Sequence, residues 1–238
     1  MAKKQQPQPK GVSIITCTRR AHFIHNVFRN YNRQTWAKKE LIIILNKDDM
    51  KIAVYKQLAK KYKNVSIYQL PEKTSLGHCL NLGVSKSKYD YVAKFDDDDY
   101  YAPKYVAGSV RAIENSKADI VGKRAYYCWL EGKRTLVLRF PKTENKFVRV
   151  VAGATLFMKR EVLRNVPFSN VSLGEDVQFC TDSRAKGYRL YAGSKYNFAA
   201  IRRKNRAGHT WKAKDDYILK RNAKIVPGVR DFRKYVTK

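Results

Sequence analysis

Four short apolar runs, each followed by a segment of different periodicity, constrain the fold of this chain more than any other feature. The runs are Gly11 to Cys17, Leu41 to Leu45, Val65 to Leu70 and Tyr89 to Phe95. They have the length and composition of buried strands. Apolar strands that are joined by helices form mostly parallel sheets covered on both faces. The first part of the chain therefore predicts an α/β fold.

The segments between these runs have the spacing of amphipathic helices, with apolar residues three and four positions apart. Ile24, Val27, Phe28 and Tyr31 form the first such stripe, and a second one begins at Ile52. Ser75 is a suitable N-cap for a third helix, which contains Leu76, Cys79, Leu80 and Val84 on one face.

The second half of the sequence is less regular. We expect strands at Asp119 to Gly122, Ala125 to Leu130 and Leu136 to Phe140, and helices near Lys159 to Asn165 and from Glu175 to about Lys186. The sequence contains no internal repeat and no clear linker. We therefore expect one compact domain over residues 11–215, preceded by a disordered basic lead-in (1–10) and followed by a basic C-terminal tail (216–238).

The charge balance predicts an anionic partner. The chain of 238 residues contains 50 Lys and Arg but only 20 Asp and Glu, a formal net charge of +30. Such a charge suits a nucleic acid, a membrane surface, a phosphate-rich ligand or an acidic polymer. The apolar runs are too short to cross a bilayer, and the four cysteines are widely spaced. These features predict a cytoplasmic protein, peripheral to an anionic surface if that is where its partner lies.

Four consecutive carboxylates, Asp96 to Asp99, directly follow the fourth expected strand. Open α/β sheets bind ligands at the carboxyl ends of their strands. Carboxylates that repel one another at such a position favour a site for a hard divalent cation such as Mg²⁺ or Mn²⁺. The alternative is a solvated acidic turn, because aspartate is common in loops and at helix N-caps.

A second acidic pair, Glu175 and Asp176, follows Gly174 at the start of an expected helix. The helix dipole stabilises a carboxylate there, and an ionised Asp176 next to a substrate hydroxyl can act as a general base. Acidic residues in a first helical turn are also ordinary, so spacing alone leaves a structural role open.

A basic stretch from Arg202 to Trp211 contains the third candidate group. Its arginines suit a diphosphate, and His209 can bind a metal or position a phosphate. An exposed basic loop without a ligand is the alternative.

The order of these features resembles the family 2 glycosyltransferases, which have the GT-A fold. Asp96 to Pro103 (DDDDYYAP) is similar to the D-x-D-D…P segment of that family, and Leu173 to Phe179 (LGEDVQF) to its E-D motif. Ser75 to Gly83 resembles its G-x-x-x-A-L-N-x-G helix, and Gly153 to Glu161 its acceptor-side segment. The resemblance extends from about Gly11 to Trp211 and depends on several motifs in order.

The sequence departs from the family pattern at two strand ends. Asn46 to Asp49 stands where D-D-x-S is usual, and Thr16 to Arg19 stands where Pro-Thr-Tyr/Phe-Asn is common. The Q-x-x-R-W motif of processive synthases is missing from the sequence, which favours the addition of a single sugar.

The resemblance implies a nucleotide-diphosphate sugar as donor, with a UDP-sugar as the first candidate, and Mn²⁺ or Mg²⁺ as the cation. The residues that it assigns to the nucleotide base are Thr16, Thr18, Arg19 and Asn46. Asp96 or Asp97 would contact the ribose or the metal. Asp98 and Asp99 would hold the metal, with help from His209. Arg202, Arg203 and Arg206 would contact the diphosphate.

The resemblance also implies a catalytic role for Asp176, next to Glu175 in the E-D motif. Asp176 would deprotonate the acceptor hydroxyl for direct attack on the anomeric carbon, with inversion of configuration.

Another function class stays open at this point, namely a basic protein that binds nucleic acid or an anionic polymer without catalysis. The two can combine, because a glycosyltransferase with a basic surface can act on an anionic acceptor. Candidates are a glycopolymer, a nucleic acid and a lipid-phosphate at a membrane surface.

Overall fold

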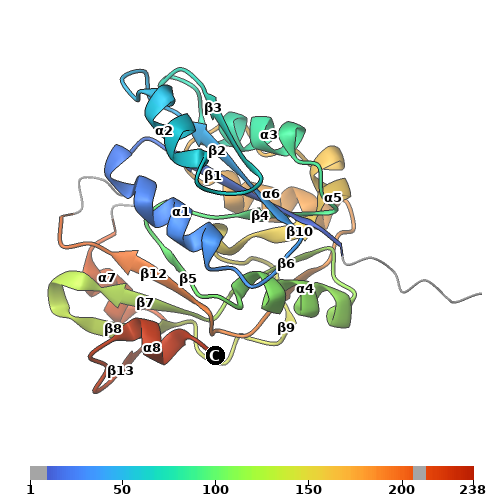
Figure 1. Ribbon diagram of the computed structural model, residues 1–238. Coiled ribbons are helices and arrows are strands. Elements are labelled where there is room, and N and C mark those ends of the chain that lie inside the picture. Colours follow the sequence, from blue (N-terminus) through green and yellow to red (C-terminus); the bar gives the residue numbers. More distant parts are fainter. Residues whose placement is uncertain (1–9, 206–212) are drawn as a thin grey trace, which may run out of the picture.

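The computed structural model describes residues 10–205 and 213–238 of the chain (Figure 1). The expectations for residues 1–9, Arg206 and His209 therefore lie outside the described residues. In the described part of the chain, no helix combines the length and the apolar character that a membrane span needs.

The larger of two sheets contains the strands that the first half of the sequence predicts. Its strand order is β3 (Val65–Gln69), β2 (Lys39–Leu45), β1 (Val12–Thr18), β4 (Tyr91–Lys94), β10 (Phe157–Lys159), β6 (Ile120–Gly122), β11 (Leu190–Ala192) and β9 (Lys146–Phe147). The first four strands are parallel, β10 is antiparallel to both of its neighbours, and β9 is antiparallel to β11. The prediction of a mostly parallel α/β sheet is confirmed.

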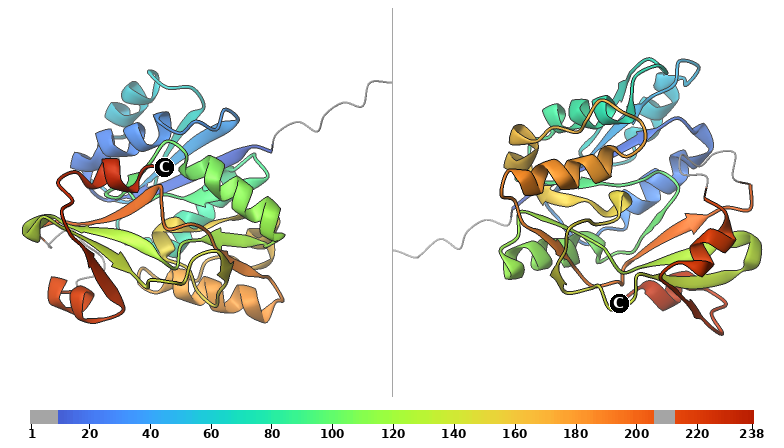
Figure 2. Two further views of the ribbon diagram at one scale, coloured as in Figure 1. Left: turned by 90° about the horizontal axis from the view of Figure 1, so that it is seen from below. Right: turned by 180° about the vertical axis from the view of Figure 1, so that it is seen from behind.

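Helices cover both faces of this sheet, because its strands are apolar on both sides. One face packs against α1 (Ile24–Asn32), α2 (Ile52–Ala59) and α4 (Tyr105–Ser116). The other face packs against α3 (Leu76–Lys86), α5 (Arg160–Asn165) and α6 (Glu175–Ala185), which are seen from behind in Figure 2. The Ser75 hydroxyl accepts a hydrogen bond from the His78 backbone N–H, so the predicted N-cap of α3 is confirmed.

The second half of the chain is more regular than its sequence patterns predict, because it also forms a sheet of its own. The order in this second sheet is β13 (Ala223–Val226), β8 (Thr135–Arg139), β7 (Tyr126–Leu130), β12 (Phe198–Arg202) and β5 (Tyr100–Tyr101). The strands expected at Ala125 to Leu130 and Leu136 to Phe140 pair as a hairpin, β7 and β8, and its turn is the 3₁₀ helix η2 (Glu131–Lys133). β12 and β13 lie far from this hairpin in the sequence, which is why local patterns miss the sheet.

The residues that the sequence sets apart as a basic tail are folded onto this second sheet. Helix α7 (Asp215–Lys220) begins at the predicted boundary, and its Ile218 packs against Cys128 and Val137 on one face. On the opposite face, Phe232 and Val236 of α8 (Phe232–Val236) are buried. Apolar side chains of the tail thus cover both faces of the second sheet.

Candidate active site

The carboxyl ends of β1, β2 and β4 meet at one edge of the large sheet. β1 lies between the other two strands, and the register pairs Thr18 at its end with Leu45 at the end of β2. The chain leaves β4 at Phe95 and enters the acidic loop, which we define as Asp96–Asp99. The acidic loop therefore lies where a parallel sheet presents ligand-binding groups, as the sequence predicts.

Helix α1 holds the backbone of the acidic loop. The Asn26 side-chain amide donates to the carbonyl oxygens of Asp97 and Asp99 at 2.8 and 2.9 Å. The buried Asn30 amide donates to the Asp99 carbonyl at 2.8 Å. One turn later, Gln34 donates to the Ala102 carbonyl at 3.1 Å and accepts from the Val106 N–H at 3.1 Å. These bonds satisfy buried backbone groups and fix the position of the loop.

Arg20 neutralises the middle of the acidic loop. Its guanidinium donates to Asp98 Oδ2 at 2.9 Å and forms a two-pronged ion pair with the Asp97 carboxylate. The Thr18 hydroxyl also donates to Asp97. Burial raises the pKa of Asp97 to about 6, although Arg20 and Thr18 act in the opposite direction.

Lys94 lies between the two acidic groups of the site. Its ammonium, on a buried side chain of β4, pairs with the Asp96 carboxylate. Burial alone would lower the pKa of Lys94, but the charges of Asp96, Glu175 and Asp176 raise it above its ordinary value. The structure thus brings the acidic loop and the Glu175–Asp176 pair together around one cation.

Asp99 faces the second sheet. Its Oδ1 accepts a hydrogen bond from the Ile201 N–H of β12 at 2.9 Å, and the residue is 8% exposed. Burial, followed by the charges of Asp98 and Asp96, raises the pKa of Asp99 well above its usual range. The last carboxyl of the loop therefore fastens the loop to β12.

A buried tyrosine connects the acidic loop to the predicted acceptor-side segment. The Tyr101 hydroxyl accepts from the Asp96 N–H at 2.8 Å and donates to the Ala154 carbonyl at 2.6 Å. The Tyr105 hydroxyl donates to the Thr155 carbonyl at 3.0 Å. Ala154 and Thr155 belong to the 3₁₀ helix η3 (Gly153–Thr155), so this segment has a fixed place beside the loop.

The start of α6 gives its two carboxyl groups different environments. Glu175 is buried, and this burial raises its pKa to about 7, although the Lys94 charge lowers it. Asp176 is half-buried, and its Oδ1 accepts from the Val177 N–H at 2.9 Å. Its carboxylate lies so close to Gly153 that any side chain at position 153 would overlap it. The glycine of the acceptor-side segment therefore makes room for Asp176.

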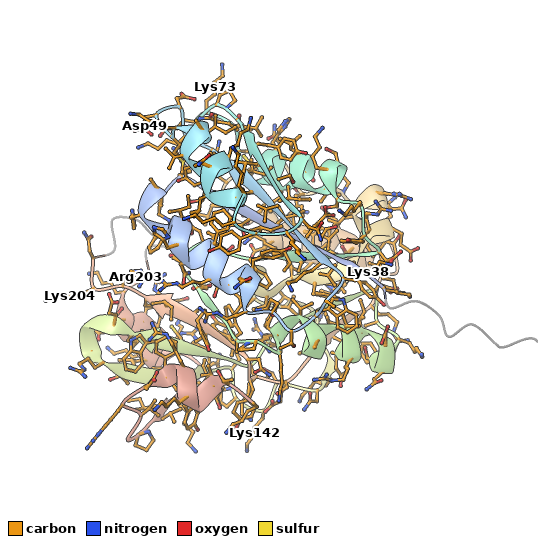
Figure 3. All side chains as sticks on the ribbon, in the orientation of Figure 1. Lys38, Asp49, Lys73, Lys142, Arg203 and Lys204 are labelled. Carbon is orange, nitrogen blue, oxygen red and sulfur yellow. The ribbon has the colours of Figure 1, made fainter. Side chains whose placement is uncertain are left out.

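Two neighbouring arginines of the basic stretch have different partners. Arg203 donates to the Asp98 carbonyl at 3.0 Å and forms an ion pair with Glu131 at 3.4 Å. The buried Arg202 donates instead to the Ala213 carbonyl at 3.0 Å. Figure 3 shows Arg203 and Lys204 where the chain leaves β12, beside the second sheet. Arg203 therefore contacts the acidic loop, whereas Arg202 contacts the chain ahead of α7.

The residues expected to bind the nucleotide base do not all lie at the strand ends. Thr18 and Arg19 do, and Arg19 is exposed and paired with Glu72 at 2.6 Å. Thr16 is buried in the interior of β1, opposite Ile43. The Asn46 amide donates to the Pro71 carbonyl at 2.8 Å and holds the loop after β3.

Sequence reasoning missed Arg20, Lys94 and three amides, Asn26 and Asn30 of α1 and Gln34 just after it. Two patterns could have found most of them. Lys94 is a cation near the end of an apolar run, just before the acidic loop. Asn26, Asn30 and Gln34 recur every four residues, a spacing that places Asn26 and Asn30 on one side of α1 and continues past its end. Arg20 has no comparable pattern, because its partners are far away in the sequence.

The described residues include no cluster of three or more His, Cys, Asp or Glu side chains that could hold a metal ion. Mg²⁺ usually takes only one or two carboxylates from a protein and completes its shell with water and substrate phosphates. The described site can supply that smaller number of ligands.

The sequence profile of Glycosyl transferase family 2 matches residues 12–170. The chain belongs to this family. The match includes the acidic loop and the acceptor-side segment, and the resemblance that the motifs predicted is confirmed. A comparison with curated proteins gave no match.

Solved structures show that this family 2 chain has the GT-A fold. S. aureus TarS (residues 1–349) in complex with UDP-GlcNAc is similar, with a TM-score of 0.68 and 13% identity over 88% of this chain and 64% of that one. The mannosyltransferase PcManGT from Pyrobaculum calidifontis, in complex with GDP-Man and Mn²⁺, gives a TM-score of 0.64 and 15% identity over 85% of this chain and 59% of that one. This chain spans about 60% of the length of these structures.

Proposed function

We propose that this family 2 chain is a metal-dependent inverting glycosyltransferase that moves one sugar from a nucleotide-diphosphate sugar to an acceptor hydroxyl. One observation carries the proposal. The acidic loop and the Glu175–Asp176 pair lie together at the carboxyl edge of the sheet, joined by Lys94 and by the contacts of Tyr101 and Gly153. A donor site and a base for the acceptor are thus adjacent.

The donor would lie over the ends of β1 and β4. Thr18 and Arg19 would lie beside the base, and Asp96, the most exposed carboxylate of the acidic loop, would contact the ribose. Arg203 would assist at the diphosphate, with the same role proposed for Arg206. UDP is the first candidate nucleotide, and the complexes of TarS with UDP-GlcNAc and of the mannosyltransferase with GDP-Man support a nucleotide sugar.

The acidic loop fits a divalent cation. Asp97 and Asp98 already share one cation, the Arg20 guanidinium, so the place suits positive charge. We assign the metal to Asp98, with His209 as a further candidate, whereas Asp99 already accepts a backbone hydrogen bond. When bound, Mn²⁺ or Mg²⁺ would neutralise the charge that develops on the leaving diphosphate.

Asp176 would act as the general base. Its carboxylate is half-buried beside Gly153, at the beginning of α6. Its neighbour Glu175 is buried, and this burial raises the pKa of Glu175 to about 7. Asp176 would take the proton of the acceptor hydroxyl as its oxygen attacks the anomeric carbon, and the nucleotide diphosphate would leave from the opposite face.

The acceptor would be anionic. Positive charge far exceeds what one diphosphate needs, with 50 basic against 20 acidic residues. A hollow of about 350 Å³ opens on the second sheet, between Trp129 of β7, the start of β8 and the segment that leads from β13 toward α8. Its lining includes Trp129, Arg134 and Arg230, and none of the described residues that line it is acidic. Sugar rings stack on indole and anionic groups pair with guanidinium, which suits a charged acceptor chain.

Thermal unfolding with a panel of nucleoside diphosphates, each with and without Mn²⁺, tests the donor proposal. A ligand raises the unfolding temperature only if it binds the native protein. We expect UDP with Mn²⁺ to give the largest shift. If no nucleoside diphosphate raises the unfolding temperature under either condition, the proposed function is wrong.

A binding assay tests the acceptor proposal with three immobilised probes: an anionic polysaccharide, a single-stranded oligonucleotide and vesicles containing an anionic phospholipid. One double variant, Arg134→Gln with Arg230→Gln, removes two charges from the hollow and should strongly weaken binding of the true acceptor class. The control is the double variant Arg233→Gln with Lys234→Gln, which removes the same charge from α8 and should weaken binding far less. If both double variants lose binding equally on every probe, the hollow is not a specific site for the acceptor.

A further inference from the structure

Arg20 pairs with both central carboxylates of the acidic loop, Asp97 and Asp98, at once. Its Nη1 is 2.9 Å from Asp98 Oδ2, its Nε is 3.2 Å from Asp97 Oδ2, and its Nη2 pairs with Asp97 Oδ1. The Asp97 side chain is 3% exposed and the Asp98 side chain 10% exposed, against 22% for Arg20. Water therefore screens this group poorly, and Arg20 contributes strongly to neutralising the two aspartates.

An aromatic ring holds this guanidinium in place. The Cζ atom of Arg20 lies 4.7 Å from the centroid of Phe23, and the Cζ atom of Arg203 lies at the same distance from the same ring. Arg203 also donates to the Asp98 carbonyl at 3.0 Å. Phe23 thus contacts two guanidinium groups that both reach the acidic loop, one through side chains and one through backbone.

We propose that Arg20 is a resident counter-ion that competes with the divalent cation for Asp98, so that metal and donor diphosphate bind cooperatively. The inference rests on the proposed function, because it assigns the metal and the diphosphate to this loop. Arg20 is then a positioning residue, which disfavours binding of the metal alone and favours binding of the metal together with the diphosphate.

The cooperativity follows from the charges. A metal ion that binds alone must separate Arg20 from Asp98 and so break their ion pair, which is costly where water screens charges poorly. When a diphosphate is present, its oxygens can accept the N–H groups that Asp98 releases, because a guanidinium fork matches phosphate as well as carboxylate. The same guanidinium keeps its contacts with Asp97 and Phe23 throughout.

Mn²⁺ titration followed by the electron paramagnetic resonance of free Mn²⁺ tests this inference without any measurement of activity. In the unaltered protein, the best nucleoside diphosphate of the thermal panel should tighten Mn²⁺ binding by about ten-fold or more. In Arg20→Gln, Mn²⁺ alone should bind about ten-fold more tightly, because its competitor is gone. The enhancement by the diphosphate should then largely disappear.

Two matched variants separate this role from a general charge effect. Arg29→Gln removes the same charge from the exposed side of α1 and should leave Mn²⁺ affinity within about two-fold. Arg20→Lys keeps the positive charge and should keep most of the competition. If Arg20→Gln unfolds, Phe23→Leu replaces it, because loss of the ring frees the guanidinium and should strengthen binding of Mn²⁺ alone by about three-fold.

Unchanged Mn²⁺ affinity and unchanged coupling in folded Arg20→Gln or Phe23→Leu would overturn the inference. A different result would overturn the proposed function instead, namely an unaltered protein that binds neither Mn²⁺ nor a nucleoside diphosphate. The two failures are therefore distinguishable.

Discussion

The acidic loop and the Glu175–Asp176 pair are both runs of neighbouring carboxyl groups, but the protein treats them in opposite ways. The acidic loop receives two cations, Arg20 and Lys94, and its backbone is tied to α1. The pair at the start of α6 interacts with the charge of Lys94 without a direct ion pair to it. One of its carboxyl groups is buried, with a raised pKa, and the other is half-buried.

This difference matches two kinds of chemistry. Carboxylates that are held by cations and by fixed backbone provide a preformed place for a charged ligand. A half-buried carboxylate beside a glycine is accessible to a substrate hydroxyl, as a general base must be. Under the proposed function, the first region would bind the donor and the second would take part in the reaction.

The sharpest test of this contrast is Asp176→Asn. Loss of the base should lower kcat by about 10³-fold, while metal-dependent nucleotide binding stays near that of the unaltered protein. Steady-state kinetics and calorimetry measure the two effects. The control is Asp182→Asn, which makes the same carboxylate-to-amide change elsewhere on α6 and should retain full activity. Full activity in Asp176→Asn would exclude Asp176 as the base.

The opposite pattern is expected for Asp98→Asn. Loss of one carboxylate ligand should weaken Mn²⁺–nucleotide binding by about 10- to 100-fold, because few protein ligands hold the ion. Calorimetric titration with and without Mn²⁺ measures this effect. Asp49→Asn removes an exposed carboxylate next to Lys47 and serves as the control. If Asp98→Asn binds with unchanged metal dependence, the metal belongs elsewhere.

Lys94→Met tests whether the two regions depend on one cation. The change leaves Asp96, Glu175 and Asp176 without their shared positive charge, and the free energy of unfolding should fall by about 2 kcal/mol. Urea denaturation measures the loss. Lys56→Met on the exposed side of α2 should change stability by less than about 0.5 kcal/mol. A similarly small change in Lys94→Met would show that the two acidic regions are independent.

The smallest effect concerns Glu175 and appears as a dependence of stability on pH. Its pKa in the folded protein, about 7, exceeds the ordinary value of 4.5, so the folded state binds the extra proton between these values and loses stability as the pH rises through them. Glu175→Gln mimics the protonated form. It should therefore gain about 1 kcal/mol relative to the unaltered protein at pH 8, with little difference at pH 4.

Urea denaturation at both pH values measures this gain. Glu161→Gln, also in the first turn of a helix but exposed, is the control and should show no such pH-dependent gain. Equal stability changes in the two variants at pH 8 would contradict the buried, proton-binding state of Glu175.

The sequence predicts the parallel half of the first sheet (β1 to β4) and β6, because these strands are encoded locally, but it misses the short strands β9, β10 and β11. Leu41 to Leu45 is apolar at every position, and Ser75 caps α3 through its own side chain. The second sheet depends on pairing between distant segments. Strand β12 pairs with β5 and β7, and β13 pairs with β8, so no window of neighbouring residues contains the information.

The candidate site divides in the same way. Its carboxylates are visible in the sequence as Asp96 to Asp99 and as Glu175-Asp176, because both are contiguous and follow recognisable elements. Their partners are visible only in three dimensions. Arg20 meets Asp97 and Asp98 across the sheet edge, and Asn30 reaches the Asp99 carbonyl from α1.

The Tyr101 hydroxyl has a consequence for the precision of the transfer step. A single rigid phenol sets the spacing between the backbone at Asp96, on the donor side, and the backbone at Ala154, on the acceptor side. Group transfer requires the reacting atoms to approach within about 3.5 Å, and small displacements reduce the rate strongly. Under the proposed function, this one hydroxyl would tie the backbone beside the donor to the backbone beside the acceptor, so a shift of either segment would be passed to the other.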